Sequence, residues 1–76
     1  MEGMKFVPDR LEVAVGDRVT WTNRDIVPHS VTAKSGGIES GDLTQGQSWT
    51  YVARAPGEIE YLCRLHPAMR GALVVK

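Results

Sequence analysis

The sequence predicts an antiparallel β-sandwich or barrel, and three observations support this fold class. Apolar residues alternate with polar ones at a period of two, which is typical of half-buried strands and not of helices. Turn-forming residues interrupt the chain at intervals too short for helices of ordinary length. The length of 76 residues suffices for one small domain, so we expect a single domain over residues 1–76.

The expected strands follow one another with little chain between them. We expect strands at 4–7, 11–15, 18–23, 29–33, 47–53, 58–63 and 71–75. Apolar and polar residues alternate clearly in the second, third, fifth and sixth of these segments, while β-branched and aromatic residues indicate the other three. Turn signals separate them at Pro8-Asp9, Gly16-Asp17, Asn23-Arg24-Asp25, Ser35-Gly36-Gly37 and Pro56-Gly57. Residues 33–47 have the least pattern, and we expect a surface loop there with a short strand near 38–40.

Composition and charge exclude several classes of protein. Hydrophobic residues make up 42% of the chain and charged residues 24%, so disorder is excluded. Nine basic residues balance nine acidic ones, which disfavours binding to nucleic acid or to an anionic membrane. The single cysteine excludes an intramolecular disulfide. No apolar run is long enough to span a membrane, and the first residues lack the features of a signal peptide.

Three candidate metal ligands lie close together near the C-terminus. Cys63, His66 and Met69 fall between a predicted strand that ends at the cysteine and another that begins after Gly71. The only other histidine, His29, starts a different predicted strand. A sandwich could place it at the same end of the molecule as the loop that carries the other three.

Two histidines and a cysteine with a weak methionine ligand form the set that suits copper in electron transfer. Thiolate and thioether favour Cu(I) and imidazole accommodates Cu(II), so one site can serve both oxidation states. Zinc is the competing metal, but structural zinc sites prefer two or more thiolates and rarely include a thioether. Taken singly, each of these four side chains is more often a core or surface residue, and the hypothesis depends on their combination.

Two other function classes fit the residues less well. A thiol enzyme with Cys63 as nucleophile and His66 as base needs an orienting third group and a substrate cleft, for which a small sandwich has little room. A β-barrel that binds single-stranded nucleic acid could stack bases on Trp21 and Trp49, but the balanced charge and the alternating positions of these residues favour core burial.

The chain resembles the cupredoxins, the family of type 1 or blue copper proteins. The resemblance runs along nearly the whole chain and is carried by the segments Met4–Pro8, Val15–Asn23, Pro28–Val31, Pro56–Cys63 and Gly71–Val75, together with the loop Cys63-x₂-His66-Pro67-x-Met69-Arg70-Gly71. This ligand loop is most similar to those of amicyanins and plastocyanins. The resemblance implies an eight-stranded Greek-key sandwich whose N-terminal strand is largely missing here.

The same resemblance implies one type 1 copper ion per chain, with His29, Cys63 and His66 as equatorial ligands and Met69 as the axial ligand. Ser30 stands where these relatives have an asparagine, which leaves the hydrogen bonds between the two ligand loops unspecified. The resemblance further implies a periplasmic or other extracytoplasmic location.

The function expected from the sequence is therefore that of a non-enzymatic electron carrier that cycles Cu(II) and Cu(I) between redox partners. A copper storage or delivery protein is the main alternative, and a detached domain of a larger copper oxidase is a third. We expect a monomer without a membrane span or a nucleic acid partner. A dehydrogenase, cytochrome or oxidase would dock near Val27, Pro28, His66, Pro67 and Ala68.

Overall fold

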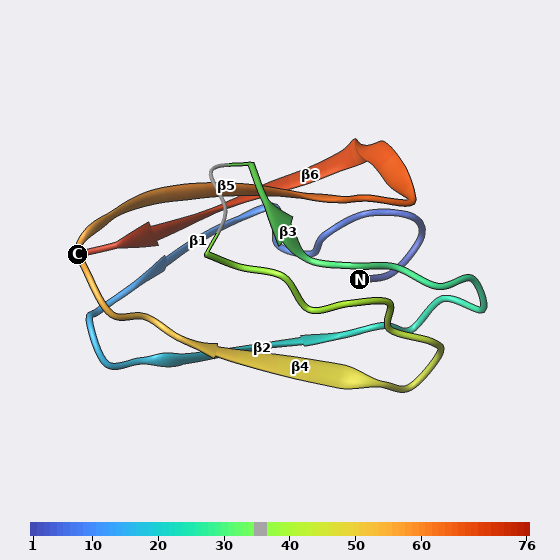
Figure 1. Cartoon of the computed structure of the whole chain (residues 1–76), viewed down its shortest axis with the longest axis horizontal. Coiled ribbons are helices and arrows are strands. Elements are labelled where there is room, and N and C mark those ends of the chain that lie inside the picture. The colour runs from blue at the N-terminus through green and yellow to red at the C-terminus, as the bar shows by residue number, and fades with distance from the viewer. Residues whose placement is uncertain (35–36) are drawn as a thin grey trace.

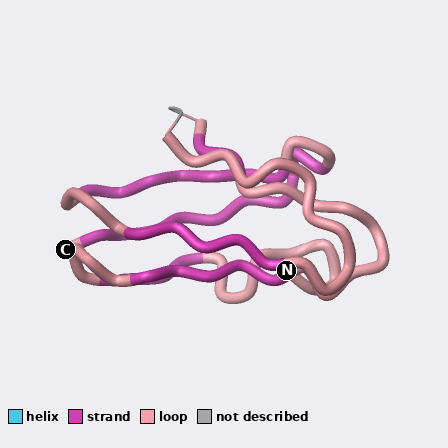
Figure 2. Tube along the Cα trace, turned by 60° about the horizontal axis from the view of Figure 1, so that its bottom comes forward, coloured by secondary structure: helices cyan, strands magenta, loops and turns pink. Residues whose placement is uncertain are grey.

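A computed structural model describes residues 1–34 and 37–76, and this part of the chain contains strands and no helix. The strands are β1 (Arg10–Val13), β2 (Arg18–Thr22), β3 (Thr32–Ala33), β4 (Ser48–Val52), β5 (Gly57–Cys63) and β6 (His66–Val75). They form two layers, and the longer loops gather at the end of the molecule away from the C-terminus (Figures 1 and 2). In the described residues, no helix has the length and apolar character needed to cross a membrane.

One layer is a four-stranded sheet in the order β1-β6-β5-β3, and the other is the pair β2-β4. β5 and β6 are antiparallel neighbours, as are β3 and β5. The pairing of β1 with β6 is parallel, with Arg10 opposite Ala72 and Val13 opposite Val75. In the second layer Trp21 lies opposite Trp49.

The core lies between the two layers and is built by the alternation seen in the sequence. In β2, Val19 and Trp21 are buried while their neighbours point outward. Tyr61 of β5 links the layers, because its ring packs edge-on against Trp21 with 5.5 Å between ring centroids. Phe6 also packs edge-on against the Tyr61 ring, with 4.8 Å between ring centroids. Contacts of this kind favour one arrangement of the two sheets over others.

The predicted all-β sandwich is confirmed, but several element boundaries differ from the prediction. Residues 4–7 form no strand, and six strands are found in the described residues instead of seven or eight. The strand expected at 29–33 is reduced to β3, with His29 forming only an isolated bridge to Leu43. The predicted segment 38–40 likewise forms only a bridge, between Glu39 and Thr32.

Two further expectations need correction. The segment expected to be a ligand loop after Cys63 is a tight hairpin, since β6 already begins at His66. The segment 33–47 is not entirely on the surface, because Ile38 and Leu43 are buried in the core. The turn signal at Ser35-Gly36-Gly37 falls partly on residues 35 and 36, which lie outside the described residues.

Candidate metal centre

Two chain segments bring the predicted ligands to one end of the molecule. β5 ends at Cys63 and β6 begins at His66, and these two residues face each other across a two-residue turn. His29 lies in the connection between β2 and β3, where its backbone exchanges two hydrogen bonds with Leu43 (3.0 and 2.7 Å). Figure 1 shows the β5–β6 hairpin and this connection at the same end, opposite the C-terminus.

The closest contact among the predicted ligands joins His29 and Cys63. The His29 Nδ1 atom lies 3.7 Å from the Cys63 Sγ atom, and both side chains are fully buried. A metal bound to both at lengths of about 2.0 Å to nitrogen and 2.3 Å to sulfur, with an angle of about 110–120° between the two bonds, would hold these atoms roughly 3.5–3.7 Å apart. The separation of the two donor atoms therefore fits a shared metal ion.

His66 lies beside His29, and Met69 is buried in the core. The ring of His66 is half-buried and packs edge-on against that of His29, with 5.2 Å between centroids. Met69 is buried in the same core cluster as Cys63. Within residues 1–34 and 37–76, no three His, Cys, Asp or Glu side chains are close enough together to hold a metal ion as they stand. His29 and Cys63 are thus in contact inside the core, whereas His66 lies beside His29 and is partly exposed to solvent.

Ser30 connects the two ligand segments. Its backbone N–H donates to the Cys63 sulfur at 3.3 Å, and its hydroxyl oxygen accepts a hydrogen bond from the Arg64 N–H at 2.9 Å. The hydroxyl also lies 3.1 Å from that of Thr32. A hydrogen bond to sulfur stabilises its anionic form, which is the form that binds metals. The serine therefore supplies the cross-loop contacts that the sequence left unspecified.

A carboxylate holds the outer face of His29. The Oδ2 atom of Asp25 lies 2.8 Å from His29 Nε2, and the carboxylate also accepts hydrogen bonds from the Met4 and Gly3 amides, each at 2.9 Å. The Met4 amide, the His29 ring and the Gly3 amide, in that order, lower the pKa of Asp25 from 3.8 to about 2. Asp25 is therefore an anion at neutral pH and only accepts hydrogen bonds.

The turn between Cys63 and His66 is tied to the segment before β4 by Arg64. Its guanidinium donates to Glu39 Oε2 at 3.3 Å and to Asp42 Oδ1 at 3.0 Å. Partial burial alone would raise the pKa of Glu39, but hydrogen bonds from the Gly41 amide and the Thr32 hydroxyl and the charge of Arg64 outweigh it, so this pKa is lowered. The carboxylate therefore stays charged and keeps the turn in place.

The site residues predicted from the sequence do not include Asp25, Glu39 or Arg64. Asp25 was assigned only to a turn, and its place four residues before His29 is the one signal that pointed to a contact. For Arg64 and Glu39, which lie 25 residues apart in the chain, spacing gave no signal. Their contact depends on how the loop before β4 folds back onto the hairpin.

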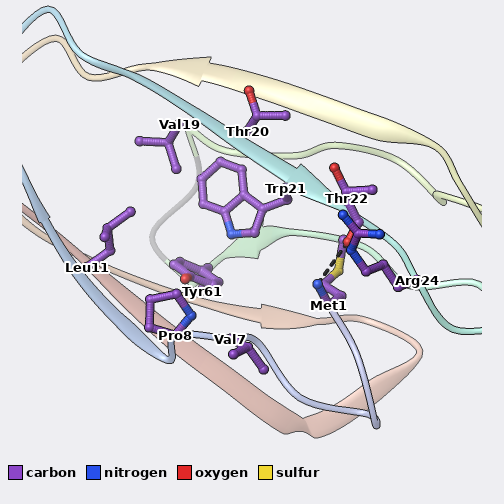
Figure 3. Close-up of a pocket in the computed structure, with 10 residues that line it drawn as sticks. All are labelled: Met1, Val7, Pro8, Leu11, Val19, Thr20, Trp21, Thr22, Arg24 and Tyr61. Atoms are coloured by element: carbon purple, nitrogen blue, oxygen red, sulfur yellow. Dashed lines mark hydrogen bonds between the residues drawn. The ribbon is translucent and has the colours of Figure 1, made fainter.

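A cavity of about 210 Å³ opens between β2 and the segment that precedes β1. Figure 3 shows Trp21 and Tyr61 at its centre, and the amino group of Met1 at its edge, donating to the Thr22 carbonyl at 2.8 Å. None of the four predicted ligands lines this cavity. It therefore gives Cys63 no substrate cleft and does not support the thiol-enzyme alternative.

Several residues next to the two histidines in the chain are apolar and exposed. Ile26 is 84% exposed, and Val27 and Leu65 are 37% and 42% exposed. Pro67 and Ala68, at the start of β6, are also exposed. A charged side chain adjoins them, because the Arg70 guanidinium donates to the Pro67 carbonyl at 3.3 Å. Exposed apolar side chains of this kind are suited to contact with another protein.

Comparison with known proteins gives consistent results. The family model described as "Cupredoxin-like domain" matches residues 1–75. Amicyanin-alpha of Methylorubrum extorquens is 37% identical over 78 residues, covering 96% of this chain and 66% of the relative. Amicyanin of Paracoccus denitrificans is 35% identical, covering 96% of this chain and 60% of the relative. The chain thus spans somewhat less than two thirds of these relatives.

Solved structures agree with the sequence relatives. A reduced amicyanin mutant superposes with a TM-score of 0.93 at 32% identity, covering 100% of this chain and 77% of the other. A Cu(I) form of another amicyanin mutant gives 0.90 at 34% identity, covering 97% and 75%. The similarity therefore includes the fold of the entire described chain.

Proposed function

Because this chain belongs to the cupredoxin family, we propose that it binds one copper ion and carries electrons between redox partners by cycling Cu(II) and Cu(I). His29, Cys63 and His66 are the equatorial ligands in this proposal and Met69 is the axial one. The resemblance of the chain to amicyanins along almost its whole length supports this assignment.

The observation that carries the proposal is the 3.7 Å separation of His29 Nδ1 and Cys63 Sγ inside the core. Buried polar atoms in a protein core normally form hydrogen bonds, and these bonds are shorter than the distance between His29 Nδ1 and Cys63 Sγ. A cysteine sulfur and an imidazole nitrogen held at this spacing, with a second imidazole against the first ring and a buried methionine in the same core, are the donor types that copper prefers. When bound, copper supplies a one-electron redox change.

The residues of the chain hold this ligand set and shield it from water. Burial of His29 and Cys63 excludes solvent from two of the donors. The Ser30 amide supports the thiolate, and the Arg64 ion pairs fix the hairpin that spaces Cys63 from His66. A site that is held in one geometry needs little rearrangement when an electron arrives or leaves, which favours fast transfer.

Electrons would pass to partners at the apolar surface around His66. This ring is half-buried whereas the other three candidate ligands are buried, and the exposed residues Pro67 and Ala68 follow it in β6. The Arg70 guanidinium, which donates to the Pro67 carbonyl, borders these apolar residues with a positive charge. A net charge of zero gives little long-range steering, so apolar contact would dominate docking. A dehydrogenase or a cytochrome outside the cytoplasm is the expected class of partner, as the family resemblance implies.

Titration of the protein with Cu(II), followed by visible absorption, tests the proposal. Cu(II) bound to a cysteine thiolate gives an intense charge-transfer band, which we expect at one equivalent of copper. Cys63→Ser should abolish the band, whereas Met69→Leu should keep it and change the reduction potential, since the axial bond is weak.

Absence of the band from the unmodified protein would refute the proposal. Rapid loss of copper to a chelator in both oxidation states, with the band present, would favour a delivery protein over an electron carrier.

A further inference from the structure

The N-terminal turn of the chain contacts a carboxylate that in turn contacts a predicted copper ligand. Both ring nitrogens of His29 are engaged: Nδ1 faces Cys63, and Nε2 lies 2.8 Å from Asp25 Oδ2. The ring is fully buried, so water cannot substitute for either contact. The orientation of His29 therefore depends on the position of the Asp25 carboxylate.

Asp25 is itself fixed by backbone groups. The Gly3 N–H donates to Oδ1 and the Met4 N–H donates to Oδ2, both at 2.9 Å. On the other side, the Asp25 N–H donates to Asn23 Oδ1 at 2.8 Å. Only 16% of the Asp25 side chain is exposed, and both of its oxygens are in use. The carboxylate thus has one position in which all these contacts are made.

The turn that supplies the two amides has an unusual backbone. Glu2 and Lys5 exchange hydrogen bonds of 3.0 and 3.2 Å, and the two residues between them have φ angles of 62° (Gly3) and 61° (Met4). Positive φ at both central positions is the pattern of a type I′ turn, and it is unfavourable for methionine. The turn directs both amides toward Asp25, so a disfavoured conformation is retained where it makes these bonds.

We propose that Asp25 is the positioning residue of His29, and that the N-terminal turn of residues 2–5 holds Asp25 in place for this role. A carboxylate only accepts hydrogen bonds, so His29 Nε2 carries the ring hydrogen and donates it to Asp25. Nδ1 is then left with its lone pair facing Cys63, as a metal ligand requires. The inference rests on the proposed function. It gives residues 2–5, which include no predicted ligand, a supporting role in the metal site.

The first test uses the metal-free protein and needs no copper. ¹⁵N NMR of the His29 ring reports which of its two nitrogens carries hydrogen. We expect the Nε2–H tautomer in the unmodified protein and a mixture of tautomers in Asp25→Ala. Asp25→Asn is the second variant, in case Asp25→Ala does not fold. Its side chain has nearly the same volume as that of aspartate, but it has one acceptor oxygen fewer. The control is Asp17→Asn, because Asp17 also accepts a backbone N–H, from Ala14 at 2.9 Å, in a turn between β1 and β2.

The second test measures how fast Cu(II) is lost to excess EDTA. Replacing the partner of a ligating histidine typically weakens metal binding by about 10- to 100-fold, so we expect loss from Asp25→Ala and Asp25→Asn to be faster by about that factor. Removal of residues 1–4 should also make the loss of Cu(II) faster, because it removes both backbone amides that hold Asp25. Asp17→Asn should match the unmodified protein.

The outcomes separate this inference from the proposed function. An Nδ1–H tautomer in the metal-free protein, or an unchanged tautomer and copper loss rate in both Asp25 variants, would overturn the inference. Unchanged copper loss after removal of residues 1–4 from a protein that stays folded would overturn the role of the turn. A protein that binds no Cu(II) would refute the proposed function, while the NMR result would still decide the role of Asp25.

Discussion

Replacing Gly71 with alanine should strongly destabilise the protein, although the substitution adds a single methyl group. Gly71 lies in β6 directly opposite Tyr61 of β5. A Cβ atom at Gly71 would lie 2.6 Å from the Cε2 and Cζ atoms of Tyr61 and 2.7 Å from its hydroxyl oxygen. Non-bonded carbon atoms prefer separations of about 3.5–4.0 Å, so the ring would have to move by about 1 Å.

The magnitude follows from what surrounds the Tyr61 ring. It is 2% exposed and packs against Phe6 and Trp21, with centroid distances of 4.8 and 5.5 Å. Overpacking a core costs about 1–3 kcal/mol, and each of the two disturbed aromatic pairs costs about 0.5–1.5 kcal/mol more. We therefore expect Gly71→Ala to lower the free energy of unfolding by about 2–6 kcal/mol. For a domain of this size that is a fall in Tm of roughly 8 °C or more.

Urea denaturation followed by circular dichroism measures this loss. A double-mutant cycle with Tyr61→Leu supplies the control, because leucine has no ring to meet the new methyl group. Gly71→Ala should cost much less in that background than in the unmodified protein. A loss below about 1 kcal/mol with Tyr61 present, or an equal loss in both backgrounds, would show that the clash does not determine the stability of this site.

Three further changes have expected outcomes. Met4→Gly should raise the free energy of unfolding by roughly 0.5 kcal/mol in urea denaturation, because relief of a positive φ exceeds the entropic cost of glycine; a loss of stability would contradict this. Glu39 has a lowered pKa in the folded chain, so it stabilises the fold above about pH 4.5 and this contribution is lost as the pH falls further. Glu39→Gln should accordingly lose less stability than the unmodified protein between pH 5 and 3 in thermal melts, and parallel losses would refute the idea. Ala68→Glu should slow electron self-exchange between copies, measured by NMR line broadening, while Val52→Glu on β4 should not; equal rates would place docking elsewhere.

The sequence was most informative where a pattern is local. Alternation in β2 identified Val19 and Trp21 as core residues, since period two follows from strand geometry alone. The metal-binding role proposed for Cys63 and His66 was likewise predicted from their type and spacing. By contrast, the parallel pairing of β1 with β6 joins segments at opposite ends of the chain, and no local pattern encodes such a pairing.

The contacts that support the candidate ligands were hidden for the same reason. The role of Asp25 depends on the Gly3 and Met4 amides, which approach it only after the N-terminal turn has docked. The bonds of Ser30 to Cys63 and Arg64 also join segments far apart in the chain. Side chains whose partners are backbone groups of a distant segment leave no sequence signature, because any residue supplies the same N–H.

The pairing of β1 with β6 joins segments that leave the ribosome far apart in time. Residues 10–13 can pair only after residues 72–75 have been synthesised. Cys63 precedes those residues in the chain, so its thiol emerges before the sheet that carries it can be completed. Pairings between distant segments form slowly in any case. Without residues 72–75, β1 has no partner strand and residues 57–60 of β5 lose theirs, so this distant segment decides whether the sheet that carries Cys63 and His66 is completed.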